Sequence, residues 1–150
     1  MIKTKQEYER MKEQLAGEEE RLGLQRQVLV EAGLGGKKLE AAMAPLKSFS
    51  AQLREEVRFY ERIMARDFSL LSDLRSIGRL LIALRIASGL SQGELARRLG
   101  ASPSQVSRDE RDEYYGAPLE KIQRIFDALG FQGDVHVRPK GEEGSELALA

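Results

Sequence analysis

Apolar residues repeat every seven positions on both sides of a glycine cluster near residue 35. Before the cluster, the two positions of the repeat are Tyr8, Leu15, Leu22 and Leu29, and Met11, Glu18, Gln25 and Ala32. After it, they are Leu39, Leu46, Leu53 and Tyr60, and Ala42, Phe49, Glu56 and Ile63. Heptad spacing predicts two helices that pack along one seam. Because glycines permit a sharp reversal, residues 1–66 are expected to form an antiparallel coiled-coil helical hairpin.

Two features qualify this hairpin. Pro45 lies within the second helix, which is expected either to kink there or to begin after a separate short turn at residues 37–43. Polar residues at seam positions fix the register or face a partner. Since an isolated two-helix hairpin buries little apolar surface, the arm is expected to form a homodimer; the alternative is an arm that packs on the downstream domain.

The heptad repeat ends at residues 67–73, which are interpreted as a hinge. A helix capped by Ser72 or Asp73 is expected to follow and to end at Ser88-Gly89; its apolar face consists of Leu74, Ile77, Leu80, Leu81, Leu84 and Ile86. Another helix is predicted at residues 119–129, before Gly130, with Leu119, Ile122, Ile125, Phe126 and Leu129 on one stripe. Residues 74–130 therefore form a second domain of four to five short helices.

Two helix-start signatures lie between those helices, at Ser91–Glu94 and Ser102–Gln105. In each, the Ser hydroxyl can accept from the backbone N–H three residues on, while the Glu or Gln side chain reaches back to the Ser N–H. Gly100 can take the positive φ that ends a helix, and Pro103 suits a first helical position. The pattern predicts two short helices across a tight turn, a helix-turn-helix.

Charge is unevenly distributed although the chain has 24 basic and 24 acidic residues. Residues 75–124 carry 9 basic and 6 acidic side chains, whereas residues 1–74 carry 13 of each. The local excess is the electrostatic footprint that contact with phosphates requires, and its small size predicts weak, salt-sensitive binding to double-stranded DNA.

Several functional classes are excluded by composition. The longest apolar run, residues 80–84, is far shorter than a membrane span, and the absence of Cys removes disulfides and thiolate chemistry. The single His, His136, has no ligand-spaced partners. We therefore expect a cytoplasmic protein that is not an enzyme and holds neither a metal nor a cofactor.

The C-terminal region alternates polar and apolar residues over Asp134–Arg138, which predicts one short strand. A lone strand needs a partner, and the copy from the second protomer of a dimer could supply it. Residues 141–150 are expected to form a loose tail within a C-terminal region that begins at residue 131.

The segment Leu90–Glu110 reads LSQGELARRLGASPSQVSRDE. Its Leu-Ser-Gln opening, Glu-Leu-Ala, turn Gly, Val106 and closing Ser-Arg-x-Glu resemble the XRE (Cro/cI, lambda-repressor-like) helix-turn-helix family. The resemblance covers about residues 74–130. It implies an all-α, lambda-repressor-like domain that binds DNA with residues 102–110 in the major groove, and a buried ion pair between Arg85 and Glu110.

The resemblance also implies the residues that touch DNA. Gln92 would contact a phosphate at a helix N-terminus, Arg108 could pair with guanine and Gln105 with adenine. The complete candidate set is Gln92, Pro103, Ser104, Gln105, Arg108 and Arg111; for the residues of the second helix, the alternative is an ordinary solvated face.

The loop after Glu110 departs from the family because it is longer and acidic. Asp109, Asp112 and Glu113 would repel phosphates, while Arg111 and two tyrosines could reach them. The alternative is that the hydroxyls of these tyrosines, Tyr114 and Tyr115, pack against the arm.

Three functions follow from these features. The first is a dimeric bacterial or phage transcriptional regulator, which would bind inverted half-sites about one DNA turn apart. The second is an antitoxin, since the domain resembles the DNA-binding part of HigA-like antitoxins and the arm could bind a toxin. The third is a protein-interaction module whose helix-turn-helix has lost DNA binding.

Overall fold

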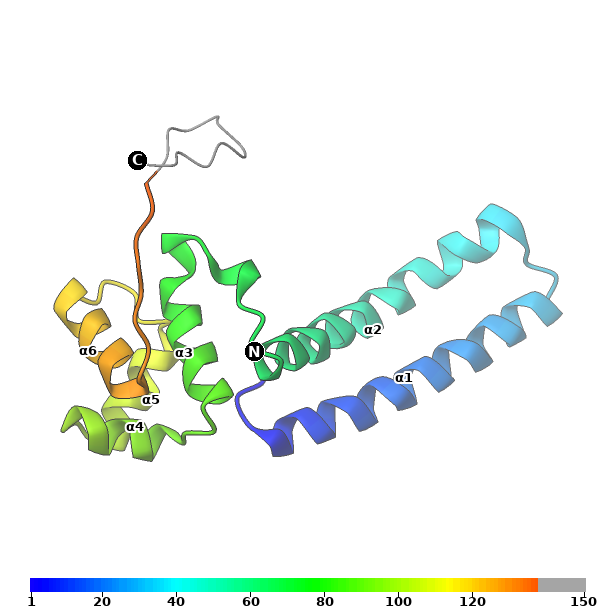
Figure 1. Cartoon of the computed structure of the whole chain (residues 1–150). Coiled ribbons are helices and arrows are strands. Elements are labelled where there is room, and N and C mark those ends of the chain that lie inside the picture. Colours follow the sequence, from blue (N-terminus) through cyan, green and yellow to red (C-terminus); the bar gives the residue numbers. More distant parts are fainter. Residues whose placement is uncertain (138–150) are drawn as a thin grey trace.

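Two long helices form an arm that projects from a group of four shorter α-helices (Figure 1). The structure, a computed structural model, describes residues 1–137, and all regular structure in this range is helical. The arm comprises α1 (Lys5–Glu31) and α2 (Gly36–Met64). After two single-turn 3₁₀ helices, η1 (Ser69–Leu71) and η2 (Leu74–Ser76), come α3 (Ile77–Ala87), α4 (Gln92–Leu99), α5 (Pro103–Arg111) and α6 (Leu119–Leu129).

The helical hairpin is confirmed, and its turn lies at the predicted glycines. Gly33 has a φ of 85°, a conformation that an L residue rarely adopts, so the chain can reverse there. Thr4 caps α1 through a complete capping box with Glu7. Helix α2 continues through Pro45 without a break, so residues 37–43 do not form a separate turn.

Part of the predicted α2 seam is wrong. Leu39, Leu53, Tyr60 and Ile63 are buried as expected and Leu46 is half-buried, but Met43, Ser50 and Val57 are buried in place of Ala42, Phe49 and Glu56. Met43, Ser50 and Val57 come four positions after Leu39, Leu46 and Leu53, whereas the predicted residues come three positions after them. At 3.6 residues per turn both spacings lie on the same side of a helix, so the elements packed against α2, which are α1 and the domain core at the base of the arm, decide which is covered. Phe49 is 43% exposed.

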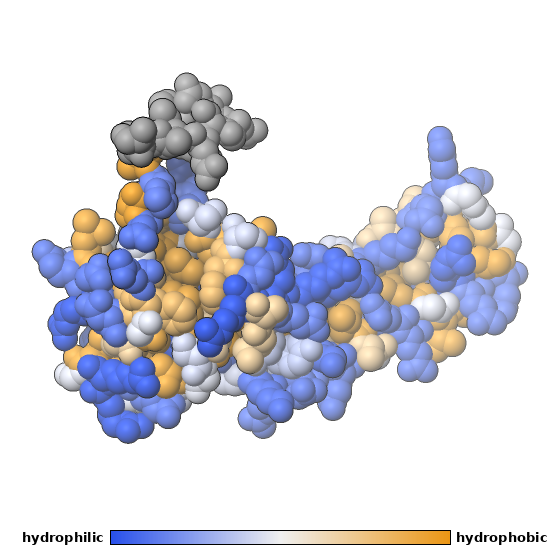
Figure 2. Space-filling view, in the orientation of Figure 1, coloured by the Kyte–Doolittle hydropathy of each residue, from blue (hydrophilic) through white to orange (hydrophobic). Residues whose placement is uncertain are grey.

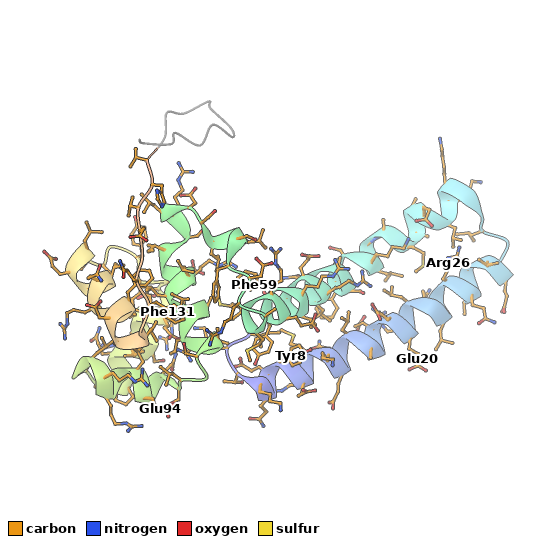
Figure 3. The ribbon with its side chains drawn as sticks, viewed as in Figure 1. Tyr8, Glu20, Arg26, Phe59, Glu94 and Phe131 are labelled. Atoms are coloured by element: carbon orange, nitrogen blue, oxygen red, sulfur yellow. The ribbon has the colours of Figure 1, made fainter. Side chains whose placement is uncertain are left out.

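The base of the arm and the short helices share one hydrophobic core. Ile2, Val57, Tyr60 and Ile63 from the arm lie in the same buried cluster as Leu81 of α3. Tyr8 and Tyr60 stack with ring centroids 4.7 Å apart, and the Tyr8 hydroxyl donates to Glu61 at 2.8 Å. Figure 3 shows Tyr8 and Phe59 where the arm joins the domain, with Glu20 and Arg26 farther out along α1. The arm is therefore packed onto the domain at its base.

The segment between arm and domain, predicted as a hinge, contributes to this core through Leu71, which is 3% exposed. Predicted domain limits at residues 66, 73 and 130 stay predictions. Within residues 1–137, none of the helices has the length and apolar composition that crossing a bilayer requires.

The predicted C-terminal strand is not present over residues 134–137. These residues have no regular secondary structure, and Val135 and Val137 are 71% and 90% exposed. The reason is that an extended segment becomes a strand only when a neighbour accepts and donates its backbone hydrogen bonds. Arg138, the last residue of the predicted strand, and the tail 141–150 lie outside the described residues.

Candidate nucleic-acid interface

The turn between α4 and α5 has the predicted backbone. Ser91 accepts from the N–H of Glu94 and donates its own N–H to the Glu94 carboxylate at 2.7 Å, which completes a capping box. Hydrogen bonding to Ser91 lowers the pKa of the Glu94 carboxyl. The backbone N–H of Ser91 has the larger effect and its hydroxyl the smaller one. Gly100 ends α4 with a φ of 65°. The start of α4 is thus fixed by its own first turn; Figure 3 labels Glu94 there.

The second signature forms only half of a capping box. Ser102 accepts from the N–H of Gln105, and Pro103 occupies the first helical position as predicted. The Gln105 side chain does not reach back to Ser102; its amide donates to Asp109 at 3.1 Å. In a capping box, the amide oxygen of Gln105 would accept from the Ser102 N–H, and both of these groups are uncharged. The amide nitrogen of Gln105 instead donates to the ionised Asp109 carboxylate one turn along α5, and a hydrogen bond to a charged acceptor is the stronger one.

A buried ion pair holds the other end of α5. Arg85 of α3 donates from Nε and Nη2 to the two carboxylate oxygens of Glu110, at 2.5 and 2.8 Å. Their side chains are 4% and 0% exposed. A third nitrogen of Arg85 donates to the Leu90 carbonyl at 2.7 Å. The ion pair implied by the family resemblance is present, and it ties α5 to α3 and to the start of α4.

Gln92 belongs to this buried group. Its amide nitrogen donates to Oε2 of Glu110 at 2.8 Å, and the side chain is half-buried. Glu110 therefore accepts from two residues, and Gln92 links the N-terminus of α4 to the last turn of α5. Contact between Gln92 and a phosphate stays a prediction.

The opposite side of α5 is open to solvent. Pro103, Ser104, Arg108 and Arg111 are exposed, whereas Val106 and Glu110 face the core. The Ser104 hydroxyl lies 3.0 Å from that of Ser102. Five of the six candidate DNA-binding residues thus lie on α5, four of them exposed and Gln105 half-buried at one flank.

A polar network runs along that flank. Arg108 donates to Oε1 of Gln105 at 3.2 Å, and Lys121 of α6 lies 2.7 Å from Oδ2 of Asp109. Sequence reasoning placed Asp109 among the residues that repel DNA and did not find Lys121. No local pattern joins two residues that are twelve positions apart on different helices.

Helix α6 is fastened to the helix-turn-helix at both sides. Arg124 donates to the carbonyl of Leu99, and Arg98 donates to the carbonyl of Ala128, at 3.0 and 2.8 Å. Each arginine donates to a carbonyl in the last turn of the other helix, where the carbonyl has no partner within that helix. The position of α6 relative to α4 and α5 is therefore well defined.

The two tyrosines of the acidic loop after α5 lie in different environments. Tyr114 is 6% exposed and belongs to the core, while Tyr115 is 95% exposed. Burial raises the pKa of Tyr114, with the charge of Glu110 adding to the effect. Arg79 of α3 lies 4.0 Å from the Glu113 carboxylate, which offsets part of the negative charge of the loop. Only Tyr115 can therefore reach outward.

The face of the molecule seen in Figure 2 is a mixture of hydrophilic and apolar residues. Figure 2 shows hydrophilic residues over much of both the arm and the short-helix domain, interrupted by separate apolar patches. Two of the large exposed apolar residues, Leu24 and Val28, lie four positions apart on α1 and are 59% and 58% exposed. Residues four apart share a helix face, so α1 has an apolar strip that is not used in the hairpin.

Residues 76–138 match a family model described as a helix-turn-helix domain. The matched segment is less than half of the chain and contains α3 to α6. It is consistent with the XRE-like resemblance of Leu90–Glu110. Neither the curated proteins nor the solved structures contain a match to this chain.

Proposed function

We propose that this chain, which carries a helix-turn-helix domain in residues 76–138, is a sequence-specific DNA-binding regulator of transcription. A helix-turn-helix domain supports DNA as its partner; the finer proposal is a cytoplasmic regulator of bacterial or phage type that inserts α5 into the major groove. The observation that supports this proposal is the difference between the two sides of α5. On one side, Glu110 forms the buried ion pair with Arg85 that fixes α5 to α3; on the other side, Ser104, Arg108 and Arg111 are exposed.

The exposed residues have different proposed roles. Arg108 lies in the middle of the exposed face, where a guanidinium can donate two parallel hydrogen bonds to guanine. Arg111, the last residue of α5, would contact a phosphate. At the N-terminus of α5, Pro103 has no N–H and the N–H of Gln105 is bonded to Ser102. The N–H of Ser104 and the helix dipole add to the attraction for a backbone phosphate.

The test is a titration of fluorescent random-sequence duplexes at several salt concentrations, followed by selection of preferred sequences from a random duplex pool. We expect salt-dependent binding and enrichment of a defined sequence. Arg108→Ala should reduce discrimination at one base by about 1–3 kcal/mol, whereas Arg111→Ala should weaken binding to all sequences and lower the salt slope by about one. Arg26→Ala, on α1 and far from α5 (Figure 3), removes the same charge and serves as the control.

Absence of salt-dependent binding at low ionic strength would rule out this function. Unchanged DNA affinity in Arg108→Ala would favour the third possibility, an interaction module that has lost DNA recognition.

The proposal includes a homodimer formed by the arm. Because Leu39, Leu53 and Tyr60 of α2 are buried within the chain, these seam positions are not available to a second copy. The exposed pair Leu24 and Val28 on α1 supports a dimer contact on the opposite face of that helix. Light scattering should then give twice the chain mass, and Leu24→Ser with Val28→Ser should halve it. If the wild type had the mass of a single chain, the proposed homodimer would be wrong, and so would the expected binding to two inverted DNA half-sites.

An antitoxin is the second candidate, and a groove near the base of the arm favours it. The groove has a volume of about 520 Å³ and its apolar lining consists of Met1, Ile2, Met11, Phe49 and Leu53. A toxin segment could bury an apolar side chain there. If a small toxin-like reading frame lies beside the gene, its product should co-purify with this chain, and Phe49→Glu should abolish the complex. Failure to co-purify would count against this function.

A further inference from the structure

We propose that Lys121, which lies on α6 outside the helix-turn-helix pair, positions Gln105 for base recognition by pairing with Asp109. The inference rests on the proposed DNA-binding function. It assigns a specificity role to a residue that would not itself touch a base.

The side chains form a continuous chain of contacts. Nζ of Lys121 lies 2.7 Å from Oδ2 of Asp109, and the other carboxylate oxygen, Oδ1, accepts from the amide of Gln105 at 3.1 Å. Oε1 of Gln105 accepts from Arg108 at 3.2 Å. Each oxygen of Asp109 therefore has one partner, and the carboxylate joins α6 to the flank of α5.

The ion pair is partly shielded from water. The Asp109 side chain is 18% exposed and that of Lys121 36%. The two residues border a groove of about 280 Å³ whose apolar lining includes Val106 and Ile125. Attraction between charges is less screened in such a setting than on an open surface, so the pair is more persistent than an ordinary exposed salt bridge.

The backbone that carries Lys121 is fixed. Ile122 and Ile125 of α6 are buried, and the Arg124 and Arg98 side chains fasten α6 to α4 on both sides. Lys121 thus approaches Asp109 from a rigid element. A charge presented in this way can hold a side chain in one orientation, which is what base recognition requires.

The hydrogen-bond inventory of Gln105 fits the reading of one base edge. An amide has two N–H donors and two acceptor positions on its oxygen. Asp109 uses one donor and Arg108 uses one acceptor position, so one donor and one acceptor are left, as bidentate pairing with adenine needs. Without Lys121, the Asp109 carboxylate would add an unpaired negative charge beside the phosphates, and the orientation of Gln105 would be lost.

The experiment is selection from a random duplex pool, performed with the wild type and with Lys121→Met, which keeps an unbranched apolar stem and removes the ammonium group. Preference at one base position should fall at least about fivefold, the lower end of what one bidentate contact contributes. The double variant Lys121→Met with Asp109→Asn should regain the preference, because an Asn carbonyl still accepts from Gln105 and has no charge to neutralise.

Lys38→Met in α2, at the exposed far end of the arm, removes the same charge and should leave the preference unchanged. Thermal unfolding followed by circular dichroism verifies that each variant is folded, and Lys121→Arg provides a second variant that should keep the preference.

The outcomes separate the two proposals. No enriched sequence with the wild type would overturn the DNA-binding function and the role of Lys121 with it. A wild-type preference that persists in Lys121→Met would overturn the role of Lys121 alone. The same conclusion would follow if Lys121→Met weakened binding to all sequences equally and lowered the salt slope by about one, since that is the behaviour of a phosphate contact.

Discussion

The backbone carbonyl of Glu113 lies directly against Gly78 in the first turn of α3. A Cβ atom on residue 78 would be 1.7 Å from the Glu113 oxygen, which is closer than any two such atoms can approach. Glu113 and the next residue, Tyr114, have φ values of 49° and 55°, in the left-handed region that L residues rarely adopt. Gly78 therefore determines how the acidic loop returns from α5 to the core.

Replacing Gly78 by Ala should destabilise the protein, although Ala is normally the better helix residue by about 1 kcal/mol. The new methyl group forces the loop or α3 to move, and overpacking of this kind costs about 1–3 kcal/mol. Urea unfolding measures the change. Gly23→Ala is the matched control, since nothing lies within 4 Å of a Cβ at that α1 position; it should stabilise the protein. Equal effects of the two substitutions would contradict this account of Gly78.

Removing one partner of the buried ion pair should be costly. Glu110→Gln leaves the Arg85 guanidinium, 4% exposed, without a counter-charge, and such a loss destabilises a protein by about 3–5 kcal/mol. The double variant Arg85→Met with Glu110→Met should recover part of the loss, because no buried charge is then left alone. Chemical denaturation of the two variants tests this, and a double variant less stable than Glu110→Gln would contradict it.

Deleting the whole arm should unfold the short-helix domain, whereas shortening the arm should not. Deletion of residues 1–66 removes Val57, Tyr60 and Ile63 from the common core, and each buried apolar side chain contributes about 1.5–3 kcal/mol. That sum approaches the total stability of a small domain.

The matched variant replaces residues 20–52 by a short glycine-rich turn and retains the base of the arm, including the Glu19–Arg54 contact of 2.6 Å. Urea unfolding followed by circular dichroism should show a cooperative transition for the variant with the shortened arm. The variant that lacks residues 1–66 should show none. A stable domain after deletion of residues 1–66 would show that the shared core is dispensable.

The capping box of α4 should make stability depend on pH. Hydrogen bonds from Ser91 lower the folded-state pKa of Glu94 below its ordinary value of 4.5. A carboxyl with a lowered pKa contributes stability that is fully present above its unfolded-state pKa and is lost as the pH falls through the folded-state value. The difference in free energy of unfolding between wild type and Glu94→Gln should therefore shrink from about pH 6 to about pH 3. Parallel pH curves for the two proteins would exclude this contribution.

Local features of the fold were predictable because their causes lie within a few residues. The Ser91 capping box, the left-handed Gly100 and the first-turn Pro103 each depend on one helix terminus. The predicted helix at residues 119–129 matches α6, since its apolar stripe and terminal Gly130 are both local signals. Leu119 was wrongly included in the buried stripe and is 83% exposed, because no other element covers the first turn of α6 on that side. An isolated glycine in the apolar α3 was also a visible signal for a close approach at Gly78, but its neighbour could not be read from the sequence.

The candidate site was predictable only in part. The exposed positions of α5 follow from helical periodicity once Val106 is taken as buried. The partner of Gln92 does not, because Glu110 lies on another helix and comes near only through packing. The partner of Gln105 lies four positions on in the same helix, a spacing that allows a Gln–Asp hydrogen bond as well as the predicted capping box, so the local pattern alone did not decide between them.

The sequence by itself determined where α6 begins and ends, where α4 and α5 begin, that two long helices form a hairpin and that α4 and α5 form a helix-turn-helix, because caps, turn glycines and apolar periodicity act over one or two turns. The start of α3 was predicted after Ser72 or Asp73 but lies at Ile77, because Asp73 caps the separate 3₁₀ turn η2. Tertiary structure alone decided three further features: the choice of Met43, Ser50 and Val57 for the α2 seam, the packing of the arm base into the domain core, and the contact between Lys121 and Asp109. These depend on how rigid helices meet in space, and residues distant in the chain become neighbours only through that packing.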